Sequence, residues 1–231
     1  MMNDRGKMII KLISCTDRAE DLCEAAAKSC YSDKSAFELQ KSNADKTNVL
    51  EKTISMEHLS VIEHAVFTFS IEGVSRSLTH QLVRHRVASF SQQSQRYVSM
   101  KNTDYVIPYS VKMNPETLEL YNSTMSDIWA AYGKLLAKIP AEDARYVLPN
   151  ACTTNIVVTM NARELLHFFT LRCCNRAQWE IRELADEMLR QCKKAAPIIF
   201  KNAGAPCVRG SCPERELSCR KPRILERESC D

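Results

Sequence analysis

The chain has no apolar run that approaches the roughly 20 residues of a membrane-spanning helix. Its first apolar run, Met8 to Ile13, is interrupted by a lysine and is too short for a secretion signal with its cleavage site. We therefore expect a cytoplasmic protein that does not enter a membrane. Charge of one sign is also scarce. The net charge is only +4, whereas a general nucleic-acid binder concentrates far more lysine and arginine.

Internal repeats and low-complexity tracts are absent as well, so the 231 residues fit one domain with at most a small appendage. A hydrophobic share of 45% is enough to bury a core, and 26% charged residues is ordinary for a globular protein. The apolar periodicity stops near Gly204, beyond which prolines and charges dominate. We expect one domain over residues 1–203 and a Cys-rich polar tail over residues 204–231.

Cysteine, by contrast, is plentiful, with 11 residues, but the odd number and the missing export signal argue against a disulfide framework. Cysteines in apolar or helical segments are expected to be reduced and to act as small hydrophobes; these are Cys15, Cys23, Cys30, Cys152, Cys173, Cys174 and Cys192. The tail cysteines are Cys207, Cys212, Cys219 and Cys230. They form either a flexible, reduced tail or a zinc site. Their wide spacing favours the reduced tail without metal. Elemental analysis of chelator-washed protein separates the two.

Hydrophobic alternation and helical periodicity predict strands and helices in mixed order. The predicted strands cover residues 7–15, 66–73, 106–108 and 153–160. The predicted helices run from Thr16 or Asp17 to about Ser29, over about 43–56, from near Ser75, from Pro115 to about Ile139, over 141–146, from an Asn161 cap to Leu171, and over 177–195. This order predicts an α/β or α+β fold and leaves the strand order open.

The segment between Gln81 and Tyr97 combines arginines, serines, glutamines and a histidine in the order QLVRHRVASFSQQSQRY. The planar fork of arginine suits phosphate or a carbonyl-rich heterocycle, and serine hydroxyls and backbone N–H groups can complete such a site. An extended backbone would point Arg84 and Arg86 one way and His85 the other, so the segment can serve two ligands. The competing interpretation is a solvated helix end with surface ion pairs.

A longer pattern resembles a known family. Arg84-His85-Arg86, followed by Ser94 and by Arg96-Tyr97, resembles the motif of flavin-dependent thymidylate synthases. Further blocks occur in the family's order at residues 58–69, 144–149, 161–163 and 171–180, so that the resemblance covers roughly residues 8–203. Ser91-Gln92 stands where many members carry Asn-Glu. Because an amide cannot act as a base, no role that needs a carboxylate is expected of Gln92.

The resemblance implies reductive methylation of dUMP to dTMP, with FAD carrying hydride, 5,10-methylenetetrahydrofolate as carbon donor and NADPH as reductant. It also implies a central, mostly antiparallel sheet flanked by helices, and a homotetramer with shared active sites. Two rival functions remain at this stage. One is a basic nucleic-acid-binding module without flavin, and the other is a different flavin- or nucleotide-binding enzyme on the same scaffold.

The resemblance also assigns residues. FAD would be contacted by His58, Ser60, Arg84, His85, Arg86, Gln92, Asn161, Ala162, Arg163 and His167, the last standing where some relatives have asparagine. The nucleotide dUMP would be contacted by Gln81, Leu82, Val83, Arg84, Gln92, Gln93, Ser94, Gln95, Arg96, Arg145 and Arg172. Arg172 is the expected catalytic residue. It would stabilise a developing uracil anion, because a guanidinium does not lose its proton.

Simpler roles stay open for several of these residues. Ser94 is expected to bind dUMP rather than to act as a nucleophile, because the segment offers no certain general base. Arg172 can also be read as a helix C-terminal charge, and His58 and His64 as polar neighbours of the sheet. Glu180 can be a purely structural ion-pair partner.

Overall fold

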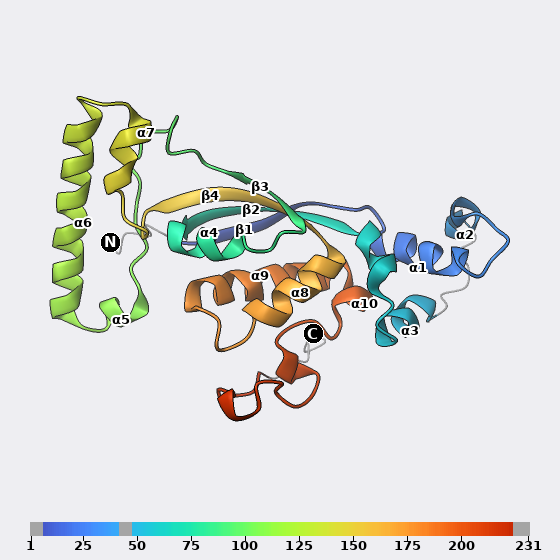
Figure 1. Ribbon diagram of the computed structural model, residues 1–231. Helices are drawn as coiled ribbons and strands as arrows, with labels where there is room; N and C mark the ends of the chain where they lie inside the picture. Colours follow the sequence, from blue (N-terminus) through green and yellow to red (C-terminus); the bar gives the residue numbers. More distant parts are fainter. Residues whose placement is uncertain (1–6, 42–47, 224–231) are drawn as a thin grey trace. The chain divides into compact units, whose positions relative to one another are not determined.

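Four strands form one antiparallel sheet in the order β1-β2-β4-β3. The structure is a computed structural model that describes residues 7–41 and 48–223, and Figure 1 shows how the elements are connected. The strands are β1 (Ile9–Cys15), β2 (Val66–Ser75), β3 (Ala88–Gln92) and β4 (Thr153–Asn161). The expected mixed fold, with a mostly antiparallel sheet flanked by helices, is confirmed.

The described residues divide into two units, which are taken in turn. Unit 1 takes residues from the ranges 1–9, 70–84 and 90–157, and unit 2 takes residues from 10–69, 85–89 and 158–231. Unit 1 contains α4 (Arg76–Leu82), α5 (Tyr109–Lys112), α6 (Pro115–Leu136), α7 (Ala141–Ala144) and the 3-10 turn η2 (Arg145–Val147). Unit 2 contains α1 (Ala19–Ser29), α2 (Ala36–Lys41), α3 (Val49–Ser55), η1 (Leu59–His64), α8 (Ala162–Arg172), α9 (Trp179–Ala195), α10 (Pro197–Phe200), η3 (Pro206–Val208) and η4 (Arg215–Leu217).

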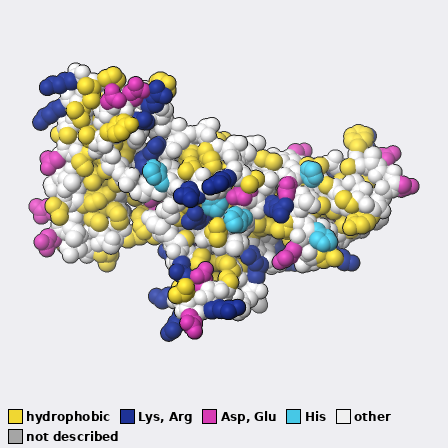
Figure 2. Space-filling view, in the orientation of Figure 1, with side chains coloured by type: hydrophobic (Ala, Val, Ile, Leu, Met, Phe, Trp, Pro, Cys, Tyr) yellow, Lys and Arg dark blue, Asp and Glu magenta, His cyan; other side chains and the backbone are white. Residues whose placement is uncertain are grey.

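The long helix α6 forms one side of the unit 1 core. It begins at Pro115 as predicted, and Asn114 caps it by accepting the N–H of Glu116 at 3.0 Å. Tyr132 is fully buried, and its hydroxyl accepts the N–H of Met100 at 3.2 Å. Other apolar side chains of α6 reach the surface, where Figure 2 shows them along the helix, and Leu120 is 67% exposed. The helix therefore leaves an apolar face uncovered in the single chain.

The core of unit 2 is aromatic. Alternation along β2 turns Phe67 and Phe69 inward, and both are fully buried. The Phe67 ring meets Phe200 of α10 edge to face at 5.4 Å, and Phe169 of α8 meets the same ring at 5.9 Å. These contacts fix α8 in place, and α8 carries several of the predicted site residues.

Two predicted features of the irregular segments are wrong. Residues 106–108 form no strand, and only an isolated bridge joins Tyr105 to Cys152. Pro108 supplies no N–H for a ladder, which explains the failure. The start of α1 also differs, because Arg18 with φ 46° occupies the N-cap position without a side-chain cap. Thr16 is engaged elsewhere, since its hydroxyl accepts the N–H of Val66 at 2.9 Å.

Other element boundaries also differ from the prediction. The helix expected over about 43–56 is α3, which begins at Val49, and residues 42–47 lie outside the described residues. The sequence also did not predict β3, α2 or α5. The helix expected from near Ser75 is confirmed, and the Ser75 hydroxyl caps α4 by accepting the N–H of Leu78 at 3.0 Å. Among the described helices, none is long and apolar enough to cross a membrane.

The cysteines of the folded units follow their expected environments in part. Cys23, Cys152, Cys173 and Cys192 are buried, as expected for small hydrophobes. Burial raises the pKa of the Cys23 and Cys152 thiols to about 11, so both stay protonated near neutral pH. Cys174 is half-buried. Cys15 and Cys30 are exposed, contrary to the expectation, because they lie at the ends of β1 and α1.

Candidate active site

A buried chain of polar contacts is centred on His85 in unit 2. The His85 ring is 4% exposed, and its Nδ1 lies 3.1 Å from Glu164 Oε1. The Nε of Arg172 donates to His85 Nε2 at 3.1 Å. His167 faces the same ring at 5.8 Å between ring centroids, and Phe168 packs against it at 4.9 Å. The structure thus joins three residues that the sequence assigns to FAD or dUMP, together with a carboxylate that it did not single out.

Helix periodicity explains why these partners converge. Glu164, Phe168 and Arg172 are four residues apart on α8, so they lie on one face of the helix. Asn161 caps α8 as predicted, because its Oδ1 accepts the N–H of Glu164 at 2.9 Å. Burial lowers the pKa of His85, and the facing charges of Arg172 and His167 lower it further, while Glu164 opposes them. Burial also lowers the pKa of the Arg172 guanidinium, which nevertheless stays charged.

A second group of unit 2 residues lies where η1 packs against α8. Arg163 on α8 pairs with Glu63 on η1, and both side chains are substantially exposed. Ser60 belongs to η1 and His58 directly precedes it, and both are exposed. The N–H of Ala162 donates to the carbonyl of Ala65 at 2.8 Å, which ties the start of α8 to the end of η1. Predicted FAD ligands from two distant parts of the sequence therefore share one surface of unit 2.

Residues 92–95, which are predicted to bind dUMP, are anchored to unit 1 by hydrogen bonds of three glutamines. Gln92, at the end of β3, donates through Nε2 to the hydroxyls of Thr79 at 3.1 Å and Thr154 at 3.3 Å. The backbone N–H of Gln93 donates to the carbonyl of Asn155 at 2.9 Å. The Gln95 side chain is buried and contacts the Cys152 sulfur at 3.7 Å. In the described chain, Gln92 and Gln95 thus support the segment.

Arg96 and Arg145 of unit 1 both contact Glu142, and Arg145 also lines a cavity. Arg96 pairs with Glu142 through its Nε at 2.9 Å and its Nη2 at 2.8 Å. Arg145 donates from Nε to the Glu142 carbonyl at 3.0 Å. A cavity of about 560 Å³ is lined by Arg145 together with Arg76 and Gln95. Burial lowers the pKa of Arg76, and the nearby charge of Arg145 lowers it further. Two guanidiniums that repel one another beside a cavity make a site for an anion.

The remaining predicted ligands have differing exposure. Leu82 is fully buried, which leaves only its backbone for a ligand. Gln81 and Ser94 are half-buried, and Ser94 Oγ accepts the N–H of Arg96 at 3.2 Å. Besides His58, Ser60 and Arg163, the exposed predicted ligands are Val83, Arg84, Arg86, Arg96 and His167. Arg84 and Arg86 are exposed on either side of the buried His85, as an alternating backbone predicts.

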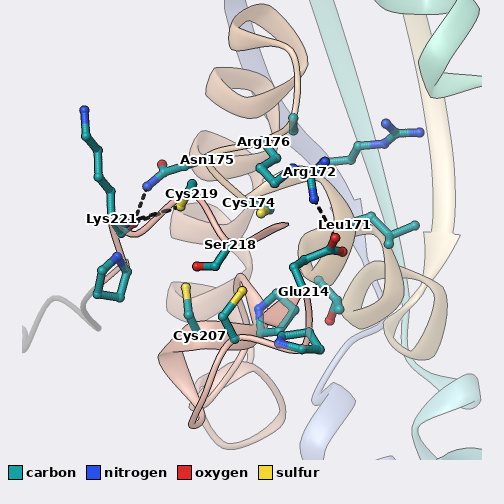
Figure 3. A pocket seen from close by; sticks show the side chains of 16 residues that line it. Leu171, Arg172, Cys174, Asn175, Arg176, Cys207, Glu214, Ser218, Cys219 and Lys221 are labelled. Carbon is teal, nitrogen blue, oxygen red and sulfur yellow. Dashed lines mark hydrogen bonds and ion pairs between the residues drawn. The ribbon is translucent and has the colours of Figure 1, made fainter. Parts of the chain in front are cut away.

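The described part of the tail, residues 204–223, packs against unit 2 (Figure 3). Arg176 pairs with Glu214, and Asn175 donates to the carbonyl of Lys221 at 2.7 Å. Arg223 pairs with Asp186 of α9 at 2.8 Å. Ion pairs and a backbone hydrogen bond thus join these residues to α9 and to the loop before it.

A cavity of about 650 Å³ separates the tail from the end of α8, and the thiols of Cys174, Cys207, Cys212 and Cys219 line it. In Figure 3 the Arg172 side chain runs away from Cys207 and Ser218. Within residues 7–41 and 48–223, no group of three or more His, Cys, Asp or Glu residues is arranged to hold a metal ion. Cys230, the fourth cysteine of the predicted tail group, lies outside the described residues.

Known proteins match this chain over almost its whole length. A family model described as "Thymidylate synthase complementing protein" matches residues 11–198. The flavin-dependent thymidylate synthase of Geobacter sulfurreducens is 50% identical over 225 residues, which cover 95% of this chain and 97% of the relative. The chain belongs to the flavin-dependent thymidylate synthase family. Relatives with the same name from Clostridium tetani and Pyrococcus abyssi are 47% and 45% identical and cover 96% and 90% of this chain, and 98% and 90% of their own length.

Membership of the flavin-dependent thymidylate synthases confirms the resemblance that rested on Arg84–Tyr97 and the blocks around it. It also argues against the alternative interpretation, a nucleic-acid-binding module without flavin. Sequence reasoning missed three carboxylates that contact predicted ligands, namely Glu63, Glu142 and Glu164. For Glu164 a signal existed, because it precedes Phe168 and Arg172 at four-residue spacing, which places an acid, an aromatic ring and a base on one face of the helix. For the other two the pairing depends on the fold.

Proposed function

We propose that this chain catalyses the reductive methylation of dUMP to dTMP, as a flavin-dependent thymidylate synthase with FAD, 5,10-methylenetetrahydrofolate and NADPH. The observation that carries this proposal is the anchored guanidinium of Arg172. Its Nε donates to His85, and within residues 7–41 and 48–223 this is the hydrogen bond of its side chain, so the other N–H groups of the planar fork can meet a carbonyl-rich ring. Relatives named for this activity cover nearly all of the chain, which supports the same conclusion.

The residues present fit FAD by their chemistry. FAD is a dinucleotide with an anionic pyrophosphate, and Arg163 and Arg86 offer exposed cations to it. The proposed FAD ligands are His58, Ser60, Arg84, His85, Arg86, Gln92, Asn161, Ala162, Arg163 and His167. When bound, FAD would supply the hydride that is transferred to the pyrimidine. Arg163 pairs with Glu63 through Nη1 in the single chain, and its other guanidinium N–H groups can donate to a phosphate.

Binding of dUMP is proposed to use unit 1 residues for the phosphate. Arg96 and Arg145 suit a dianion, because two guanidiniums can each offer paired donors. Gln81, Leu82, Val83, Arg84, Gln92, Gln93, Ser94 and Gln95 are proposed to complete this binding site. Arg172 is proposed to lie against the uracil ring, where its charge favours loss of the proton at N3 and stabilises the resulting anion.

The tritium released from dUMP labelled at C5 tests the activity. We expect release that depends on both the folate donor and NADPH, from a yellow preparation with flavin absorbance, because methylation replaces the hydrogen at C5. Leaving out the folate donor is the matched control. A colourless protein that releases no tritium under complete conditions would contradict the proposal, and a yellow protein that releases none would indicate another flavin enzyme on this scaffold.

Ser94→Ala is expected to weaken activity and to leave a measurable rate. Ser94 Oγ accepts the N–H of Arg96, and among the described residues no general base contacts this hydroxyl. The alanine variant therefore loses one hydrogen-bonding group, about 0.5–1.5 kcal/mol, and no chemical step. Tritium release from labelled dUMP measures the rate. Complete loss of turnover with intact dUMP binding would show instead that Ser94 is a nucleophile.

Assembly and location are also proposals. We propose a homotetramer with active sites shared between subunits, and the uncovered apolar face of α6 supports an interface there. Contiguous exposed apolar surface commonly marks a contact between proteins. We further propose a cytoplasmic protein in which residues 1–203 form the synthase domain and residues 204–231 an appendage.

A further inference from the structure

The position of Glu164 is unusual for a carboxylate. It lies in the first turn of α8, is 9% exposed, and is surrounded by the apolar positions Leu165 and Phe168. A helix dipole favours an acidic residue in this turn, but that effect needs no burial. Burying a carboxylate is costly unless a hydrogen bond compensates, and the observed compensation is the contact with His85 Nδ1 at 3.1 Å. The burial of Glu164 therefore indicates that its hydrogen bond with His85 is important.

The protons of the chain Glu164–His85–Arg172 can be assigned from donor chemistry. Arg172 Nε carries a hydrogen and cannot accept, so His85 Nε2 must present its lone pair. A neutral imidazole with a free Nε2 carries its proton on Nδ1. That proton points at the Glu164 carboxylate, which accepts it. The other tautomer would set two N–H groups against each other at Arg172 and leave two acceptors facing each other at Glu164.

Protonation of both ring nitrogens is disfavoured for the same reason. A doubly protonated His85 would oppose an N–H to the guanidinium of Arg172, and the two positive charges would repel. The buried position and the facing cation both lower the pKa of His85. Each contact therefore supports a single state, in which His85 is neutral with its proton on Nδ1.

We propose that Glu164 is a positioning residue for the synthase reaction. It holds His85 as the Nδ1–H tautomer, and His85 in turn fixes the direction of the Arg172 guanidinium. The inference rests on the proposed role of Arg172 at the uracil ring. Orienting groups behind a directly contacting residue commonly change activity about 10–100-fold when they are removed, as they do at metal sites. Glu164 would act through His85 and would not touch the substrate.

Two variants separate an accepting role from a merely structural one. Glu164→Ala removes the acceptor, and we expect kcat to fall about 10–100-fold while the KM for dUMP changes little. Glu164→Gln keeps an oxygen that can accept from Nδ1–H, without the strength of a charged acceptor. We expect its kcat to lie between those of the wild type and the alanine variant. A glutamine variant as slow as the alanine variant would overturn the proposal.

The tautomer provides a readout that does not depend on turnover. In FAD-loaded protein with nitrogen-15-labelled histidine, we expect His85 to show a protonated Nδ1 and an unprotonated Nε2, with His85→Gln assigning the signals. We expect Glu164→Ala to shift this signal toward the other tautomer. If the wild type shows the proton on Nε2, the proposal fails even if the variants do not fold. If the tautomer is as expected but the wild type releases no tritium from dUMP, the proposed function fails and the positioning contact stands.

The matched control is Glu116→Ala. Glu116 also lies in the first turn of a helix behind an asparagine cap, but it is exposed on α6. We expect this variant to keep the wild-type kcat and the wild-type His85 tautomer. A loss of kcat in Glu116→Ala equal to that in Glu164→Ala would trace the effect to helix stability and would overturn the proposal.

Discussion

Arg172→Ala is expected to lower kcat about 100–1000-fold while FAD stays bound. A preorganised donor aimed at developing charge contributes about this much in other enzymes. Arg172 meets the condition of preorganisation, because it is half-buried and His85 Nε2 fixes its Nε at 3.1 Å. Single-turnover oxidation of the reduced flavin by dUMP and the folate donor measures the step directly. Flavin absorbance of the purified variant checks that the cofactor is retained.

Two further variants sharpen this result. Arg172→Lys restores the positive charge but lacks the planar fork, so it cannot contact His85 and a uracil carbonyl with the same geometry. We expect it to remain at least tenfold slower than the wild type, about 1.4 kcal/mol in activation free energy. Arg176→Ala is the matched control, because Arg176 lies nearby but is exposed and pairs with Glu214 of the tail. If Arg172→Ala turned over at the wild-type rate, catalysis would lie with another residue.

The parts of the fold with strong periodicity could be predicted from the sequence. Pro115 and Asn114 mark the start of α6, and Asn161 marks the start of α8, because caps are encoded within a few residues. The strand β3 was missed, although its positions alternate between half-buried and exposed. Its sequence, Ala-Ser-Phe-Ser-Gln, has one large apolar side chain, so hydrophobic alternation gives no clear strand signal.

Part of the candidate site could likewise be predicted from the sequence, and part of it depends on the fold. The Arg84–Tyr97 segment stands out by composition, because arginines and serines are dense there. The pairing of Arg163 with Glu63 spans 100 residues, and only the packing of η1 against α8 brings the two together. The contact of Arg96 with Glu142 likewise depends on where α7 lies. Sequence spacing cannot show such contacts, since they depend on tertiary structure and not on local periodicity.

Arg145→Ala is expected to raise the KM for dUMP about 10–100-fold, with a much smaller change in kcat. A hydrogen bond to a charged group contributes about 1.5–3 kcal/mol, and 1.4 kcal/mol corresponds to tenfold in affinity. Arg145 lines the unit 1 cavity beside Arg76, whose pKa is lowered by burial and by the Arg145 charge. A phosphate in this cavity would relieve the repulsion between these two cations. Removal of the Arg145 guanidinium should therefore weaken dUMP binding more than it slows the chemical step.

The phosphate itself supplies the decisive comparison. Deoxyuridine lacks this group, so wild type and Arg145→Ala should process it with similar, low kcat/KM if the arginine binds phosphate alone. Lys138→Ala controls for the lost positive charge, because Lys138 is exposed and close in the sequence. We expect it to leave the KM for dUMP unchanged. A penalty of equal size with dUMP and deoxyuridine would show that Arg145 supports the fold of unit 1 through its bond to Glu142, and that the phosphate is bound elsewhere.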